Sequence, residues 1–507
     1  MAHAVRAPAP HVVVLTSPGV GHVAPVAELA TRLAALHGVT STIVTYTNLS
    51  SPGGGSPALA SLPPGISTAA LPEVPLDDLP AAAHMVTRIL TVVRRTLPHL
   101  RALLRSLLDG SPSGGGVTAF LADMLCPAAL AVARELGVPR YVFYTSSLMS
   151  LATLLYTPEL ARTTACECRD LPAPVVLPGC LPLHGADLVE PLQERADPVF
   201  GLLVDLGLDY LHSDGFIVNT FDALEHETLE AFRELSDKGV YPPAYAVGPL
   251  VRSSPDEASA AEHRCTAWLD EQPDGSVLYV CFGSGGTLST LQTAELAAGL
   301  EASGQKFLWV VRFPNDKDSS ACYINGGKTT ADHGGDADDP MSYLPEGFVE
   351  RTRAVGLVVP EWAPQVEILG HRAVGGFLTH CGWNSALEAV AAGVPALAWP
   401  LFAEQRMNAV KLASEHVGLA LRVRAREDDG VVPREEVAAA ARELMVGDRG
   451  AVARQRAREL RAEARRASAP GGPAHQALAA VVDMWKCAAA SSAAADAAAG
   501  GGLCMNP

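Results

Sequence analysis

The chain has 507 residues, enough for two domains, and 48% of them are hydrophobic, which is typical of a globular protein. Its net charge of −17 argues against binding to nucleic acid or to an anionic membrane surface, because both call for basic patches. Ten cysteines are spread thinly, and Cys166-Glu167-Cys168 lacks the second ligand pair that a zinc site needs. This usage fits a reducing cytosol.

The N-terminal segment does not resemble a targeting signal. Its apolar run, residues 12–15, suits a buried strand and is too short for a signal peptide. No apolar run reaches the length of a membrane span. We therefore expect a cytoplasmic monomer that does not insert into a membrane.

Strands and helices alternate from the start of the chain. A buried strand at 11–16 leads into the glycine-rich turn 17–22, a helix at 23–36 and a strand at 40–46 that is rich in β-branched residues. This βαβ unit predicts a parallel sheet. Further strands are expected at 118–122, 141–144 and 215–220, and helices at 84–108, 127–136, 146–156 and 200–212.

Composition divides the chain into segments. Residues 1–250 predict a first domain, the polar, small-residue-rich 251–265 a linker, and 266–470 a second domain with the same alternation of strands and helices. Residues 471–487 predict a helix that packs back on the first domain, and the Ala/Gly/Ser-rich 488–507 a disordered tail. The fold class is therefore α/β, with two Rossmann-like domains whose parallel sheets face each other across a cleft.

One stretch, residues 362–405, organises the second domain. A short strand at 376–379 runs into His380-Cys381-Gly382-Trp383-Asn384-Ser385, and a helix follows that stops at Gly393. Backbone N–H groups at a helix N-terminus, with the positive end of the helix dipole, make an anion site. This strand–turn–helix is suited to hold phosphate.

The same stretch resembles the signature box of plant UDP-dependent glycosyltransferases, inverting enzymes with the two-domain GT-B fold. It opens with W-A-P-Q, contains H-C-G-W-N-S and closes with E-Q. SPGVGHVAP near the start, VLPGC at 176–180, VNTFDALE at 218–225, VGPLV at 247–251 and CFGSGGT at 281–287 resemble the hydroquinone and phenylpropanoid glucosyltransferase branch. Departures are Cys281, Phe402 and Thr145-Ser146-Ser147, which stand where Ser, Tyr and P-T-T are more usual.

The resemblance implies roles for individual residues. Trp362 would stack on uracil, the Ala363 backbone would read the base edge, and Gln365 and Glu388 would bind the ribose. The diphosphate and the hexose would take the remaining donor positions: Ser284, Gly285, His380, Gly382, Asn384 and Ser385 for the diphosphate, and Glu404 and Gln405 for the hexose. For Trp383, packing of the indole and ligand contact stay open as alternatives. Gln at the end of the box goes with UDP-glucose in the family.

The resemblance also implies the chemistry. His22 matches the family's catalytic base, and Asp123 matches its partner. Thr145, Ser146 and Met124 are candidates for the acceptor pocket of the first domain. The implied reaction is inverting transfer of glucose from UDP-glucose to a hydroxyl, or an amine, of a small phenolic acceptor, giving a β-glucoside without a cofactor or a metal.

Other interpretations are weaker. Residues 19–24 fit G-x-G-x-x-A, which suggests an NAD(P)-dependent oxidoreductase, but the strand that follows ends without the acidic residue that binds the ribose. Asp336-Ala337-Asp338 spells the D-x-D of metal-dependent transferases, but it lies in the polar insertion 315–339, which we expect to be a mobile surface loop. A UDP-sugar-binding protein without catalysis is a further alternative, which the presence of His22 and Asp123 disfavours.

Overall fold

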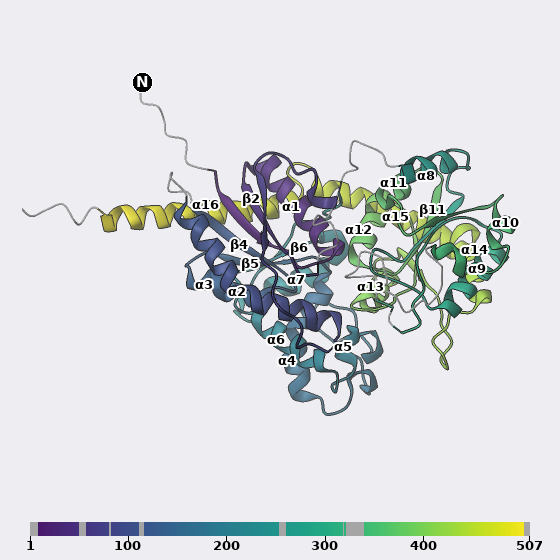
Figure 1. The fold of residues 1–507 in the computed structure, drawn as a ribbon, viewed down its shortest axis with the longest axis horizontal. Helices are drawn as coiled ribbons and strands as arrows, with labels where there is room; N and C mark the ends of the chain where they lie inside the picture. Colours follow the sequence, from purple (N-terminus) through teal and green to yellow (C-terminus); the bar gives the residue numbers. More distant parts are fainter. Residues whose placement is uncertain are drawn as a thin grey trace, which may run out of the picture.

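The computed structural model describes residues 9–49, 57–80, 83–110, 116–252, 260–317, 319–320 and 339–500. They form two α/β domains, coloured purple to teal and teal to green in Figure 1, each built on a parallel sheet. The insertion predicted at 315–339 falls largely outside these residues, as do Asp336 and Asp338.

The first sheet has the strand order β3-β2-β1-β4-β5-β6-β7, and all its pairs are parallel. The strands are β1 (His11–Leu15), β2 (Thr40–Tyr46), β3 (Ile66–Leu71), β4 (Val117–Asp123), β5 (Arg140–Tyr144), β6 (Phe216–Val218) and β7 (Ala244–Ala246). The chain adds β2 and β3 on one side of β1 and then β4 to β7 on the other side, so the strand order reverses between β1 and β4, which is the topological switch point of the sheet. A crevice forms at such a point beyond the carboxyl ends of the strands.

Helices cover both faces of this sheet. They are α1 (Val20–His37), α2 (Met85–Asp109), α3 (Leu130–Glu135), α4 (Leu148–Thr163), α5 (Glu190–Gln193), α6 (Pro198–Tyr210) and α7 (Asp222–Asp237). Four 3-10 turns are η1 (Pro57–Leu59), η2 (Pro127–Ala129), η3 (Cys168–Asp170) and η4 (Gly185–Asp187). The two largest clusters of buried apolar side chains in this domain lie on opposite sides of the sheet, because Val13 and Leu15 belong to one and Val12 and Val14 to the other.

The second sheet repeats this topology, in the order β10-β9-β8-β11-β12-β13. Its parallel strands are β8 (Val277–Cys281), β9 (Lys306–Val311), β10 (Gly356–Pro360), β11 (Val374–Thr379), β12 (Ala396–Ala398) and β13 (Ala420–Arg422). The strand order reverses between β8 and β11, so this sheet also has a topological switch point.

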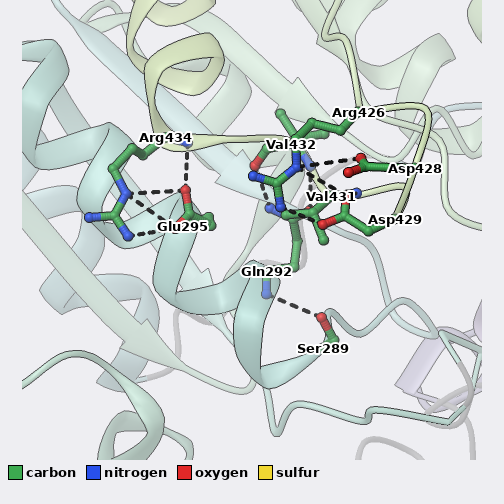
Figure 2. Close-up of polar contacts among 9 residues, drawn as sticks. All are labelled: Ser289, Gln292, Glu295, Arg426, Asp428, Asp429, Val431, Val432 and Arg434. Carbon is green, nitrogen blue, oxygen red and sulfur yellow. Dashed lines mark hydrogen bonds and ion pairs between the residues drawn. The ribbon is translucent and has the colours of Figure 1, made fainter.

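The remaining helices precede, alternate with or follow the strands of the second sheet along the chain. They are α8 (Ala260–Asp270), α9 (Thr290–Ser303), α10 (Phe348–Thr352), α11 (Gln365–Gly370), α12 (Trp383–Ala392), α13 (Gln405–Leu412), α14 (Arg434–Val446), α15 (Asp448–Ser468) and α16 (Pro473–Gly500), with a 3-10 turn η5 (Pro340–Tyr343). Figure 2 shows how α9 is joined to the start of α14 and to the residues before it: Arg434, the first residue of α14, pairs with Glu295, and the Gln292 side chain bonds both backbone groups of Val432.

Two predicted boundaries differ from the structure. Helix α8 begins at Ala260, inside the predicted linker 251–265. Helix α16 continues to Gly500, within the disordered tail predicted for 488–507, of which residues 501–507 lie outside the described residues. The alanine-rich sequence explains this second difference, because alanine has the highest helix propensity.

Helix α16 lies along the first domain (Figure 1) although it follows the second domain in sequence. Its apolar side chains Leu478, Val481, Val482 and Trp485 share a core cluster with Val12 and Val14 of β1. The fully buried Trp485 meets Tyr141 edge-on, with 5.8 Å between ring centroids.

Candidate active site

A cavity of about 1810 Å³ lies between the two domains. Its first-domain wall includes His22, Met124 and Thr145, and its second-domain wall includes Trp362 and Glu388. All the predicted donor-binding residues line it, as do the predicted acceptor residues, whereas Asp123 lies behind His22. The chain therefore folds so that residues separated by more than 300 positions face one space.

The switch points of the two sheets explain this convergence. The short turn after β1 leads into α1, whose first turn carries His22, and the neighbouring β4 ends at Asp123. In the second sheet, the turn after β8 carries Ser284, and the neighbouring β11 leads to His380. Parallel strands present their carboxyl ends at one edge, so each pair of turns lies together.

His22 and Asp123 form a buried pair. His22 Nδ1 lies 2.9 Å from Asp123 Oδ2, and the carboxylate is fully buried. The other carboxylate oxygen accepts from the Ser17 hydroxyl at 2.7 Å and from the Leu125 backbone N–H at 3.0 Å. A carboxylate only accepts, so Nδ1 carries the proton and Nε2 has the basic lone pair.

Opposing effects act on the pKa of His22. Burial is the largest and lowers it, since burial disfavours the charged imidazolium. The charge of Asp123, its hydrogen bond and the more distant Glu404 carboxylate act in the other direction, and together they raise the pKa above its usual value. The arrangement makes His22 a stronger base than an ordinary histidine.

His380 is held between two glycines. A Cβ at Gly283 would lie 2.4 Å from the ring, and one at Gly382 would also lie 2.4 Å from it, so only glycine fits at either position. Burial, followed by the charge of Arg312, lowers the pKa of His380 to about 4, so the ring is neutral near pH 7. Among the described residues its Nδ1 is buried without a hydrogen-bond partner, which is unusual in a folded protein.

A polar network lies at the first turns of α11 and α12. The Gln365 amide donates to Ser385 Oγ at 2.8 Å and to Glu388 Oε2 at 2.7 Å. Burial raises the pKa of Glu388 to about 7, the Gln365 hydrogen bond lowers it, and the charge of Glu367 adds to the rise. Hydroxyl groups that donate hydrogen bonds to the Glu388 carboxylate would lower its pKa, because they stabilise its charged form.

The two tryptophans of the box have different environments. Trp362 is 57% exposed and lines the cavity, although large apolar side chains are usually covered. Trp383 is buried, and its Nε1–H donates to the Asn219 carbonyl at 2.7 Å, across the domain interface. The Trp383 indole is thus packed at the interface, and Trp383 also lines the cavity.

Three further box residues are held by hydrogen bonds, and two of them, Asn384 and Glu404, are bonded across the domain interface. The Asn384 amide donates to the Gly21 carbonyl at 2.7 Å, although it was predicted to hold phosphate. Glu404 Oε1 accepts from the Ser146 hydroxyl at 2.9 Å. Gln405 Oε1 accepts from two backbone N–H groups of its own turn, so only its amide nitrogen remains for a ligand.

Left-handed backbone conformations cluster at this site. Glu361, Cys381 and Ala403 have φ values of 62°, 65° and 54°. Each directly precedes a predicted donor-binding residue, namely Trp362, Gly382 and Glu404. Such conformations are costly for residues with a side chain, and they concentrate where a binding geometry must be held.

Sequence reasoning missed two residues of the site. Ser17 orients Asp123, and its place in the glycine-rich turn was a usable signal. Arg312 lines the cavity and donates to the carbonyls of Ser284 and Glu361, at 3.2 Å for the latter. It stands directly after β9, a strand that the sequence reading did not include.

The comparisons with known proteins agree with this geometry. Residues 256–439 match the family model described as UDP-glucoronosyl and UDP-glucosyl transferase. The chain is 44% identical to UDP-glycosyltransferase 72B1 of Arabidopsis thaliana over 94% of this chain and 96% of that protein. The chain belongs to the plant UDP-glycosyltransferases. It is also 42% identical to the hydroquinone glucosyltransferase of Rauvolfia serpentina, over 94% of this chain and 98% of that protein.

Solved structures of UDP-glycosyltransferases have the same fold. Phytolacca americana UGT2, complexed with UDP-2fluoro-glucose and pterostilbene, matches with a TM-score of 0.82 at 39% identity, over 94% of this chain and 100% of that one. A glucosyltransferase from Polygonum tinctorium, capable of glucosylating indoxyl and complexed with 3,4-dichloroaniline, matches with a TM-score of 0.83 at 40% identity, over 95% of this chain and 99% of that one. The predicted family, the GT-B fold and the UDP-sugar donor are thereby confirmed.

The described residues lack two features. No group of three or more His, Cys, Asp and Glu side chains in that part of the chain is arranged to hold a metal ion. Within the same residues, none of the helices combines the length and the apolar character of a membrane span.

Proposed function

We propose that the protein transfers glucose from UDP-glucose to a hydroxyl group of a small phenolic acceptor and inverts the anomeric carbon to give a β-glucoside. The observation that carries this proposal is the buried His22–Asp123 pair, 2.9 Å apart, at the wall of the cavity that contains the donor residues. A phenol is favoured by the relatives, since one is named a hydroquinone glucosyltransferase and one structure holds pterostilbene.

In this proposal the donor spans the second-domain wall. The exposed indole of Trp362 stacks on uracil beside the Ala363 backbone, and Glu388 and Gln365 bind the ribose hydroxyls. The diphosphate lies against the Ser284 turn and the N-terminus of α12, where backbone N–H groups point outward. Glu404 and the Gln405 amide nitrogen contact the hexose.

The chemical step needs one base. His22 Nε2 takes the proton of the acceptor hydroxyl while the acceptor oxygen attacks the anomeric carbon from the side opposite UDP. The bond from that carbon to the diphosphate oxygen breaks, and UDP leaves with its electron pair, so the α-linked donor gives a β product. Asp123 stabilises the imidazolium that forms.

The leaving UDP gains negative charge, which several groups offset. Because the pKa of His380 is about 4, this ring offers a hydrogen bond and not a positive charge. Positive potential comes from the α12 dipole and from the Arg312 guanidinium.

The acceptor would lie against the first domain. Met124 and Thr145 flank His22, and the Thr145 hydroxyl is 3.4 Å from His22 Nδ1. Leu154 and Leu203 extend this wall with apolar surface that suits an aromatic ring.

The test is the His22→Ala variant, assayed with UDP-glucose and a panel of phenols, flavonoids, monolignols and chloroanilines by mass spectrometry. We expect the wild type to form glucosides whose anomeric proton coupling, measured by NMR on the isolated product, is that of a β linkage. In His22→Ala, turnover should fall by at least about 10²-fold, the usual contribution of a general base, with UDP affinity retained.

A matched control is His226→Ala, because His226 forms an exposed pair with Asp222 at 3.2 Å. This variant should keep full activity. Near-normal turnover by His22→Ala would refute the assignment of the base, and absence of product from the wild type with every acceptor would refute the proposed function.

A further inference from the structure

Helix α13, which begins at Gln405, the last residue of the signature box, packs against both domains. Met407 is fully buried in the core cluster of the first domain. Ala409 and Leu412 belong to the cluster that surrounds Trp383, which also includes Phe221 of the first domain. Contacts with the first domain, as well as those within the second domain, therefore fix the position of the first turn of α13.

A buried ion pair fixes this helix to the first domain. Lys411 Nζ lies 3.2 Å from Glu225 Oε1, and the two side chains are 7% and 0% exposed. Two charges so buried are stable only when they are paired, because a separated charge in this environment loses its hydration without compensation. A small shift between the domains is therefore opposed more strongly here than at a solvated surface pair.

The Glu225 carboxylate also holds a second element. It accepts hydrogen bonds from the backbone N–H groups of Leu148 and Met149, at 2.8 Å and 3.3 Å, which are the first two residues of α4. Glu225 itself has non-helical angles, φ −140° and ψ 35°, at a kink in α7. One carboxylate thus joins the start of α4 to α13.

These two helix starts carry opposing walls of the cavity. Ser146, two residues before α4, donates to Glu404 Oε1 at 2.9 Å, and Glu404 directly precedes α13. The Ser147 hydroxyl donates to Asn408 Oδ1 at 3.2 Å. Together with the ion pair, these bonds connect α4 and α13 at three levels.

We propose that Glu225 and Lys411 are positioning residues, which keep α4 and α13 in register so that Glu404 holds the hexose in line with His22. This inference rests on the proposed function, because it assigns Glu404 to the sugar. The uracil and ribose positions at Trp362 and Glu388 belong to α11, α12 and the loop before them, which the ion pair does not touch. Loss of the ion pair should therefore slow glucose transfer without weakening the binding of UDP.

The experiment compares Lys411→Met, Lys411→Arg and Glu225→Gln with the wild type. Initial rates are measured with UDP-glucose and hydroquinone, and UDP affinity by calorimetry. In Lys411→Met and Glu225→Gln, kcat should fall by about 10- to 100-fold, since ångström-scale misplacement has effects of this size. The Kd for UDP in each variant should stay within about threefold of the wild-type value. Lys411→Arg should retain most of the wild-type kcat, because it keeps a positive charge beside Glu225.

The control is Arg434→Met. Arg434 and Glu295 (Figure 2) also join two elements by an ion pair, but neither residue lines the cavity, so kcat should not change. Glu225→Gln has nearly the volume of the native residue, so it tests the inference even where Lys411→Met fails to fold.

Two results would overturn the inference. The first is a kcat within about threefold of the wild-type value in both Lys411→Met and Glu225→Gln. The second is a loss of kcat together with an equal loss of UDP affinity, in Lys411→Arg as well as in the other two variants, because this pattern indicates a merely structural role. A wild type without product overturns the proposed function, and this inference with it, whereas an active wild type with unaffected variants overturns the inference alone.

Discussion

Replacing Asp123 by Asn separates the charge of the His22 partner from its shape. The native carboxylate is fully buried and meets three donors: His22 Nδ1 at 2.9 Å, the Ser17 hydroxyl at 2.7 Å and the Leu125 N–H at 3.0 Å. Asparagine has almost the same volume but no negative charge, and its amide nitrogen has to face one of these donors. The imidazolium formed during transfer then lacks its counter-charge.

The size of the effect follows from these contacts. A hydrogen bond to a charged group contributes about 1.5–3 kcal/mol, and a general base accelerates a reaction by about 10²–10⁴-fold. We therefore expect kcat/KM of Asp123→Asn to fall by about 10²–10³-fold, which corresponds to roughly 3–4 kcal/mol in the barrier.

The pH dependence supplies an independent readout. Activity needs His22 deprotonated, so kcat/KM should rise with pH through the pKa of His22 in the unliganded protein. Burial lowers this pKa, but Asp123 and Glu404 raise it above the usual value. Without the Asp123 charge the pKa falls, and the rising limb should move to lower pH.

The assay is a series of initial rates across pH, with two controls. Ser17→Ala removes one hydrogen bond from the carboxylate but keeps its charge, so the loss should stay within about tenfold. Asp78→Asn breaks an exposed pair with Arg95 and should change nothing. Activity of Asp123→Asn within about threefold of the wild type, or a limb displaced to higher pH, would refute the reasoning.

Two further predictions concern the donor site. Burial raises the pKa of Glu388 from 4.5 to about 7, so the folded protein loses up to about 3 kcal/mol of stability as pH rises between these values. Glu388→Gln should therefore raise the melting temperature at pH 8 and not at pH 4, while weakening UDP binding; an unchanged melting temperature at pH 8 would contradict this. Gly283→Ala should weaken UDP binding at least about tenfold and destabilise the fold by about 2–4 kcal/mol, because its Cβ would lie 2.4 Å from His380 at a φ of 76°. Gly304→Ala, with a φ of 66° and open space around the Cβ, should have only the backbone cost, and equal effects of both variants on UDP binding would contradict the steric argument.

Much of the fold could be predicted from the sequence because it depends on local patterns. Strands such as β1 and β2 are short apolar or β-branched runs bounded by turns, and α12 ends at Gly393, whose φ of 75° is left-handed. The signature box specifies its own strand–turn–helix, so the donor site could be read from one contiguous stretch. The alanine-rich end of α16 was misjudged because low complexity was taken as disorder, although alanine itself favours helix.

The sequence by itself determined the family, the fold class and many of the residues that gather at the cavity, although not Arg312. Only the tertiary structure decided what those residues do to one another. It places Asp123 against His22, engages Asn384 and Trp383 with the first domain, and leaves His380 neutral between two glycines. These outcomes depend on burial and, for Asp123, Asn384 and Trp383, on contacts between residues more than 100 positions apart, which no local pattern encodes. The pairing of Glu225 with Lys411 is of the same kind, because the sequence around each residue does not indicate its partner, and the two charges come together only at the domain interface.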